Sequence, residues 1–231
     1  MENTISREIK GYPLIKFKSR EIIESLYNGE MYFSPLSVFR EYEDASGYRV
    51  IGDEREGMLP IQNAVFEDIK THELTQIDHA LIKTVNSDDY VFCFFGMEEN
   101  TSHFVFTEEQ KRKIREFGDT ALIITNYDEF EERVKKAARN EGFNVHVGRV
   151  QYYEDESDNI NMIMQSLNGM WNHAFWKHKD YAYQQEYRFL LERKGRPEDH
   201  WILHLGSLAD ISMIISTEQA LTMELKIKTE S

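Results

Sequence analysis

The segment from Trp176 to Leu191 constrains the fold of this chain more than any other stretch. Its first half is polar and aromatic, and its second half is an apolar run. Because side chains alternate between the two faces of a strand, a strand here places Gln184, Glu186 and Arg188 together on one face. A buried strand that carries a carboxylate beside a cation contains either a structural ion pair or a functional site. Both interpretations stay open at this point.

The composition favours a folded, acidic protein. The chain has 231 residues, 41% of them hydrophobic, which is enough for one large domain or two small ones. Acidic residues outnumber basic ones by 41 to 27, and the formal net charge is −14. Such a surface repels a phosphate backbone, so general nucleic-acid binding is not expected. A basic protein partner, or a small nucleotide-like ligand in a shielded cleft, fits this charge better.

Cysteine content and hydropathy indicate the cellular compartment in which this protein is expected. Cys93 is the sole cysteine and stands within an apolar run, so we expect a buried thiol and no internal disulfide. The first residues show no signal-peptide pattern, and no apolar run reaches the ~18 residues of a membrane span. We therefore expect a cytoplasmic protein that does not associate with membranes.

Hydrophobic periodicity and capping residues predict alternating strands and helices. Strands are predicted over 14–18, 31–34, 91–95, 120–125, 145–153, 201–205 and 211–216, in addition to the strand that begins near Gln184. Helices are predicted after Ser19 up to the stop at Asn28-Gly29, as a turn over 36–39, and over 107–117, 126–142, 160–170 and 217–225. Residues 61–85 are predicted to combine strands with a short helix. The fold class is thus α+β: one domain over 1–231 with mixed or mainly antiparallel sheets and peripheral helices.

Residues 40–60 form the most polar irregular segment of the first half. A solvated surface loop is the ordinary interpretation of this composition. The alternative is a binding loop, because long irregular segments in compact domains often carry function. Arg49, Asp53 and Glu56 are the candidate ligand-binding residues on that interpretation.

Several strong catalytic signatures are missing from the sequence. It contains no Gly-rich phosphate loop, no Gly-x-Ser-x-Gly and no His-Glu-x-x-His. His200 and His204 share a face of a predicted strand but lie about 13 Å apart along it, too far for one metal ion. We therefore predict no metal site. A nuclease would have to hold magnesium with Asp53, Glu54 and Glu56, the only compact acidic set.

Two passages resemble a family of bacterial and phage-encoded proteins of unknown function. The first runs from Asn28 to Phe39 and contains Met-Tyr-Phe-Ser-Pro, and the second is Tyr183-Gln184-Gln185-Glu186-Tyr187-Arg188. Together they cover about a sixth of the chain. The family continues the first passage with Asn-Asp-Pro, where this chain has Arg40-Glu41-Tyr42.

The order of strand, helix, glycine turn, Tyr-Phe-Ser strand and late Gln-x-Glu strand is also similar to that of ADP-ribosyltransferases. The resemblance implies an ADP-ribosyltransferase-like fold with NAD as substrate. It implies that Glu186 is the catalytic carboxylate, that Gln184 lies on the acceptor side and that Ser34 shapes the nicotinamide pocket. Tyr32 or Phe33 would stack on the ring.

Four further residues complete the predicted site. Such transferases carry an arginine or histidine on the first strand, where this chain has Lys16. Arg188 stands beside the carboxylate of Glu186. His178 is expected to be exposed, and it becomes a general acid or base only if its loop folds over a cleft. Tyr183 lines a pocket or packs in the core.

Two functions follow as hypotheses. The first is an enzyme that transfers or hydrolyses the glycosidic bond of NAD in a polar cleft shared by the Ser34 strand, the Arg49–Glu56 loop and the Gln184–Arg188 strand. The second is a non-enzymatic acidic inhibitor or sensor that binds a basic protein partner or a nucleotide-like ligand. The sequence indicates neither the acceptor nor the oligomeric state.

Overall fold

The structure, a computed structural model, describes residues 13–40, 53, 55–83, 88–97, 103–154, 162, 164–165, 170–193, 195, 198–223 and 225–226. These residues form an α+β protein whose sheets are mostly antiparallel. The chain divides into two compact units. Unit 1 comprises 1–34, 90–149 and 183–231, and unit 2 comprises 35–89 and 150–182. This division rests on contact density, so the single domain over 1–231 stays a prediction.

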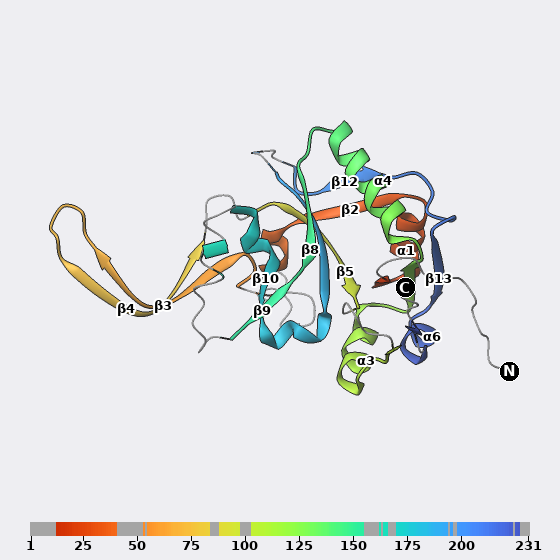
Figure 1. The fold of residues 1–231 in the computed structure, drawn as a ribbon, viewed down its shortest axis with the longest axis horizontal. Helices are drawn as coiled ribbons and strands as arrows, with labels where there is room; N and C mark the ends of the chain where they lie inside the picture. The colour runs from red at the N-terminus through yellow and green to blue at the C-terminus, as the bar shows by residue number, and fades with distance from the viewer. Residues whose placement is uncertain are drawn as a thin grey trace, which may run out of the picture. The chain divides into compact units, whose positions relative to one another are not determined.

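Unit 1 is built on an eight-stranded sheet (Figure 1). Its main path runs β12-β2-β5-β1-β7-β13, and β11 pairs with both β5 and β8. The strands are β1 (Leu14–Lys18), β2 (Glu30–Pro35), β5 (Tyr90–Gly96), β7 (Thr120–Ile124), β8 (Val145–Arg149), β11 (Glu186–Leu191), β12 (Trp201–His204) and β13 (Ser212–Ser216). The strands β6 (His103–Phe104) and β14 (Leu225–Lys226) pair separately.

The helices of unit 1 begin where the sequence supplies caps. They are α1 (Arg20–Tyr27), α3 (Glu108–Ile114), the 3-10 turn η1 (Arg115–Phe117), α4 (Tyr127–Asn140) and α6 (Thr217–Thr222). The predicted capping box of α3 is present, with Thr107 and Gln110 exchanging hydrogen bonds. Asn126 caps α4 by accepting from the Glu129 N–H. After α1 the chain turns at Gly29, whose φ of 99° and close approach to Gly206 exclude a side chain.

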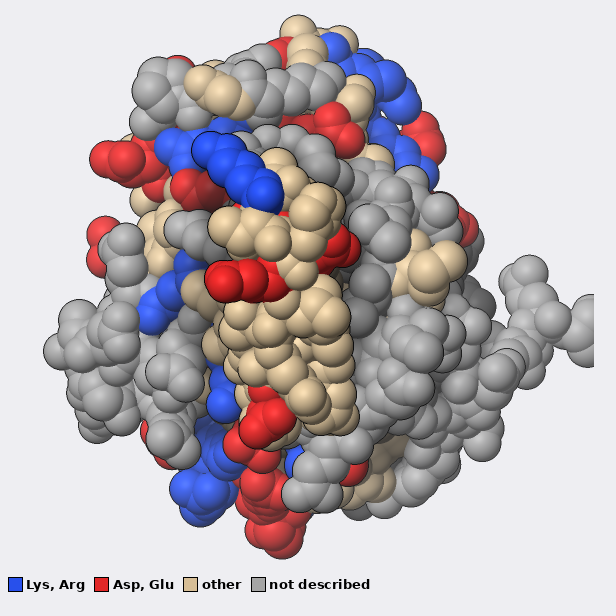
Figure 2. All heavy atoms as spheres, turned by 90° about the vertical axis from the view of Figure 1, so that its left-hand side faces the viewer, with Lys and Arg blue, Asp and Glu red and all other residues tan. Residues whose placement is uncertain are grey.

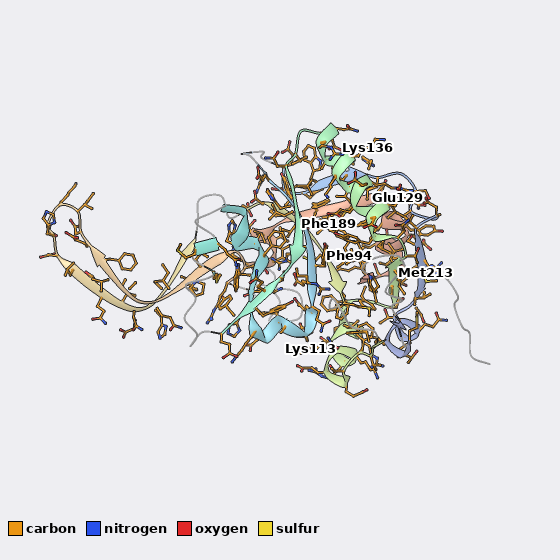
Figure 3. All side chains as sticks on the ribbon, in the orientation of Figure 1. Phe94, Lys113, Glu129, Lys136, Phe189 and Met213 are labelled. Carbon is orange, nitrogen blue, oxygen red and sulfur yellow. The ribbon has the colours of Figure 1, made fainter. Side chains whose placement is uncertain are left out.

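Each face of the large sheet has its own apolar core. On the first face, Phe94 and Phe189 pack against Phe130 of α4, and α1 adds Ile23 and Leu26 (Figure 3). On the second face, Ile114 of α3 and Leu221 of α6 belong to one core with residues of the strands, which are Ile15, Phe17, Phe95, Ala121 and Ile123. The sheet is therefore covered on both faces, and its central strands carry side chains into both cores.

Unit 2 contains one long hairpin and one short sheet. The hairpin joins β3 (Met58–Glu67) to β4 (Leu74–Lys83) in antiparallel register. The short sheet pairs β9 (Gln151–Tyr153) with β10 (Trp176–His178) in parallel, and the 3-10 turn η2 (Met170–Phe175) precedes β10. A small core joins Leu59, Tyr153 and Met162 with Trp176 packed against it.

Three predicted elements differ from the structure. Residues 61–83 contain no helix, because cross-strand pairing carries the mixed periodicity along the whole hairpin. The strand predicted over 145–153 is two strands, since Val150 interrupts it and β9 joins a different sheet from β8. Met164, predicted to be core in the 160–170 helix, is half exposed. The rest of that predicted stripe lies outside the described residues.

The remaining predicted strands and helices of the described residues are confirmed within a few positions, with one exception. The late strand begins at Glu186, and Gln184 instead ends the 3-10 segment η3 (Lys179–Gln184). No described helix is both long and apolar enough to cross a membrane.

Candidate functional site

Glu186 and Arg188 lie on β11, which is between β5 and β8 in the large sheet of unit 1. In the register of β11 with β5, Glu186 is opposite Phe95 and Arg188 is opposite Cys93. On the other edge, Arg188 is opposite Gly148 of β8. All six residues of β11 are buried, including both charged ones. A strand with neighbours on both edges holds its side chains in fixed positions, as a catalytic group requires.

The two charged side chains of β11 pair with each other. Arg188 Nε donates to Glu186 Oε2 at 2.7 Å, and Arg188 Nη2 lies 2.6 Å from the same oxygen. Glu186 is 8% exposed and Arg188 2%. Charge-assisted bonds of this length fix the orientation of the carboxylate, and pairing offsets the cost of burying both charges. The ion pair that was one of the two interpretations of this strand is therefore present in the structure.

Backbone strain marks the entry to β11. Gln185 has a φ of 40°, in the left-handed region that side chains other than Gly and Asn seldom adopt. Its carbonyl accepts from the Gly96 N–H at 2.8 Å, which holds the turn against β5. Gly96 has no room for a side chain, because a Cβ there would lie 2.9 Å from the Cβ of Tyr187. The turn aligns Glu186 with the sheet immediately after the strained residue.

The same turn overturns one detail of the predicted site. Gln184, Glu186 and Arg188 were expected to alternate along one strand face, but Gln184 precedes the strand and Gln185 breaks the alternation. Gln184 is nevertheless buried, and its Nε2 donates to the Tyr183 hydroxyl at 3.2 Å. The amide is close to Glu186 in the chain, but a turn determines its direction.

Ser34 and Tyr32 lie on the same face of the sheet as Glu186 and Arg188. Along β2, Met31 and Phe33 point into the core under α4, so the alternating Tyr32 and Ser34 belong to the opposite face. On β11, Tyr187 and Phe189 fill the α4 core, which places Glu186 and Arg188 on that opposite face too. Because β5 lies between β2 and β11, these two strands are about 10 Å apart across the sheet. Ser34 and Glu186 are further apart than this, because the Leu36 N–H just after β2 donates to the Asp89 carbonyl before β5, whereas Glu186 is opposite Phe95 near the end of β5.

Tyr32 is available on the surface, whereas Phe33 is not. The Tyr32 side chain is half exposed and stacks on the imidazole of His200, with ring centroids 4.8 Å apart. Phe33 is fully buried and packs 5.9 Å from the Phe92 ring. Stacking of a ligand on Phe33 is therefore wrong for this structure.

Lys16, the basic residue of the first strand, reaches the edge of β5. Its Nζ donates to the Cys93 carbonyl at 2.6 Å and lies 4.2 Å from the centroid of the Phe92 ring. Burial lowers the pKa of Lys16 to about 8, and the charge of Glu186 acts in the opposite direction. Leu14 of β1 belongs to the α4 core, so alternation places Lys16 on that face too, opposite to the face that carries Glu186. Cys93 itself is half-buried, in place of the full burial expected.

Tyr183 packs rather than lining an open surface. The Nζ of Lys113 (labelled in Figure 3) lies 3.8 Å from the centroid of its ring. Gln110 Nε2 donates to the Tyr183 carbonyl at 3.3 Å. Gln110, which is part of the capping box of α3, therefore also holds the segment that leads into Glu186.

The acidic residues predicted for the 40–60 loop belong to unit 2 and are buried. Asp53 is 2% exposed and Glu56 1%, so the surface-loop interpretation is wrong for both. Asp53 Oδ1 accepts from the Arg55 N–H, and its own N–H donates to the Phe39 carbonyl. Arg49 and Glu54 lie outside the described residues.

Two buried basic residues of unit 2 contact Glu56 and a third lies beside the next residue, and none of the three was assigned to the site from the sequence. Lys177 Nζ lies 3.4 Å from Glu56 Oε2, and Arg40 donates to the Glu56 carbonyl at 2.7 Å. His173 is fully buried and lies against Gly57. These partners are far apart in sequence, so no local pattern could have revealed them. Their direct effect is to fix Glu56 two residues before β3 begins.

His178 is less exposed than predicted. Its side chain is 13% exposed, its Nδ1 lies 3.3 Å from Asp180 Oδ2, and its ring packs against Tyr153. Within the described ranges, no group of three or more His, Cys, Asp or Glu residues is placed to hold a metal ion.

Comparison with known proteins adds no identification. No protein-family model matches the chain, and neither a curated protein nor a solved structure matches it.

Proposed function

We propose that the protein cleaves the glycosidic bond between nicotinamide and ribose in NAD, with Glu186 as the catalytic carboxylate. The observation that supports this most is the fixed Glu186–Arg188 pair on the sheet face that also carries Ser34 and Tyr32. An ADP-ribosyltransferase-like fold, and kinship with the bacterial and phage-encoded proteins of similar motifs, belong to the same proposal.

The chemistry places its main demand on a fixed negative charge. As the C1′–N bond breaks, nicotinamide leaves with the bonding electron pair and positive charge develops on the ribose. A preorganised carboxylate stabilises this charge better in the transition state than in the ground state. Water, or the nucleophilic atom of an acceptor, then forms the new bond to C1′ and loses its proton.

Each neighbouring residue has a distinct task in this proposal. Arg188 holds the Glu186 carboxylate in one orientation through two short contacts with Oε2. Ser34 and Tyr32 bind the nicotinamide in this proposal. Lys16 does not join them, because its ammonium group lies against Phe92 of the α4 core, on the other face of the sheet. Gln184 contributes to acceptor binding from the turn before the strand.

The direct test is nicotinamide release from NAD by the full chain, followed by chromatography. The parent protein is expected to release nicotinamide, and Glu186→Gln is expected to lower the rate by two to three orders of magnitude, roughly the worth of one electrostatic stabiliser. Glu192→Gln is the matched control, because Glu192 pairs with His146 at the other end of β11.

Two results would contradict the proposal: no nicotinamide release by the folded parent protein, or an undiminished rate in Glu186→Gln. Because an amide beside Arg188 can weaken folding, the circular dichroism spectrum and NAD binding of the variant are measured in parallel. Loss of turnover with retained binding assigns a catalytic task to Glu186.

A further inference from the structure

The outer half of the β3–β4 hairpin in unit 2 exposes large apolar side chains. Every residue from Val65 to His79 is exposed. The apolar side chains among them are Val65 at 61%, Phe66 at 42%, Ile69 at 88%, Leu74 at 69% and Ile77 at 36%. The register places Val65 and Leu74 on one face of the ribbon and Phe66 and Ile77 on the other, so both faces near the tip expose apolar side chains. Several exposed apolar residues within one short element mark an interaction site.

The tip of the hairpin is a hydrogen-bonded turn that carries the exposed Ile69. Asp68 Oδ1 accepts from the Lys70 and Thr71 N–H groups at 2.8 and 2.9 Å. The Asp68 N–H donates to the Glu73 carbonyl, and the His72 N–H donates to the Asp68 carbonyl. A turn with this many bonds holds the exposed isoleucine in place before any partner arrives, which lowers the entropic cost of binding.

The root of the hairpin is also fixed. Glu56 stands two residues before β3, and its side chain and carbonyl contact Lys177 and Arg40 in the buried part of unit 2. The Met58 N–H donates to the Arg55 carbonyl, closing the turn that leads into the strand. A rigid root and an ordered tip make the hairpin an arm with a defined binding end.

Acidic residues surround the apolar tip. Between Gln62 and Leu81 the chain carries Glu67, Asp68, Glu73 and Asp78 against the single Lys70. Hydrogen bonds from the Thr71 and Lys70 N–H groups hold the pKa of Asp68 below its usual value, so this carboxylate stays charged. Figure 2, which faces the left-hand side of Figure 1, shows a central band of uncharged side chains with acidic groups set among them.

We propose that this hairpin arm binds a partner protein whose surface has an apolar groove bordered by lysine or arginine. The apolar tip residues fill the groove, and the acidic residues pair with its basic border. A second copy of the chain suits the arm poorly, because both copies carry a net charge of −14. The inference rests on residues 62–81 of unit 2 and does not depend on the activity proposed for Glu186.

The test uses two synthetic peptides that share one helical leucine face. The other face is lysine in the first peptide and glutamate in the second. Fluorescence anisotropy at physiological salt measures the binding of each to three proteins: the parent, the hairpin variant Ile69→Ser/Leu74→Ser, and the control Ile22→Ser/Val105→Ser. The control residues are each 49% exposed and belong to unit 1.

The parent and the control variant are expected to bind the leucine–lysine peptide equally. The hairpin variant is expected to bind it at least about tenfold more weakly, the usual effect of removing central apolar contacts. The leucine–glutamate peptide is expected to bind the parent at least about tenfold more weakly than its lysine twin. Hydrogen exchange is expected to show protection by the peptide within residues 64–77.

Three results would overturn the inference. Equal binding by the parent and the hairpin variant would show attraction to the acidic surface in general. Equal binding of the two peptides would show that the partner needs no basic residues around its groove. A dimer in sedimentation experiments that dissociates on Ile69→Ser/Leu74→Ser would make a second copy the occupant. None of these results bears on nicotinamide release, so the two proposals fail separately.

Discussion

Strand β11 and the β3–β4 hairpin are both antiparallel pairings, but they have opposite environments. Strand β11 carries two charged residues and is buried along its whole length. The outer hairpin carries Val65, Phe66, Ile69 and Leu74 and is exposed along its whole length. The two charged residues of β11 and the apolar residues of the outer hairpin are therefore each in an environment opposite to the preference of their own side chains.

The difference teaches that neighbouring elements decide burial, not strand composition. Strand β11 has β5 on one edge and β8 on the other, and its charges are satisfied by each other. Among the described residues, β3 and β4 pair only with each other. An isolated two-stranded ribbon gains little from the hydrophobic effect, so its order depends on its turn and its root.

The largest effect is expected from breaking the ion pair of β11. Arg188→Ala leaves the Glu186 carboxylate buried without its closest cation, which is expected to lower the free energy of unfolding by about 3–5 kcal/mol. Urea denaturation at pH 7 measures this change. The control Arg115→Ala breaks an exposed pair with Glu218, and a smaller loss is expected. Equal losses in the two variants would contradict the distinction between buried and exposed pairs.

Removing one phenylalanine from β5, the strand next to β11, and one from the hairpin compares the two environments directly. Phe94→Ala opens a cavity between β5 and α4 and is expected to cost about 3–5 kcal/mol in the free energy of unfolding. Phe66→Ala, in the exposed hairpin, is expected to cost less than about 1 kcal/mol. Both values come from the same urea titrations. A large loss for Phe66→Ala would show that the hairpin contributes to a core.

The lowered pKa of Lys16 predicts a pH dependence of stability. Its pKa is about 8 in the folded protein and 10.5 when unfolded, so the unfolded state binds more protons between these values. Stability is therefore expected to rise from pH 8 to 10.5, by up to about 3 kcal/mol. Lys16→Met is expected to flatten this slope. Lys70→Met, in the hairpin, is expected to leave the slope unchanged, and a flattened slope there would refute the assignment.

The smallest effect is expected at the left-handed kink in β3. Asn63 has a φ of 49°, which asparagine tolerates better than alanine. Asn63→Ala is expected to lower the local stability of the hairpin by about 1 kcal/mol, seen as faster hydrogen exchange over residues 64–67 and 74–77. Gln62→Ala is the control with ordinary backbone angles. Unchanged exchange rates in Asn63→Ala would show that the kink carries no strain.

Elements with a local signal were predictable from the sequence. The capping box at Thr107, the Asn126 cap and the stop at Gly29 all depend on residues within one turn of each other. The alternation of Tyr187 and Phe189 likewise predicted which side of β11 faces a core. Such signals need no partner from elsewhere in the chain.

The candidate site was predictable only in part. Alternation identified Glu186 and Arg188 as neighbours, and the structure pairs them. Alternation misplaced Gln184, because the left-handed Gln185 precedes the strand, which begins only at Glu186. The interpretation of residues 40–60 as a surface loop also misjudged Glu56, which is buried and pairs with Lys177 from a distant part of the chain.

By itself the sequence determined which segments become helices and strands. It also determined which side chains of a strand share a face. Those properties follow from backbone geometry and from hydrogen bonds within a few residues. Only the tertiary structure decided that Glu186 and Arg188 of β11 are buried and that Val65, Phe66, Ile69 and Leu74 of the hairpin are exposed. Burial is a property of the surface shared with neighbouring elements, and long-range pairing selects those neighbours.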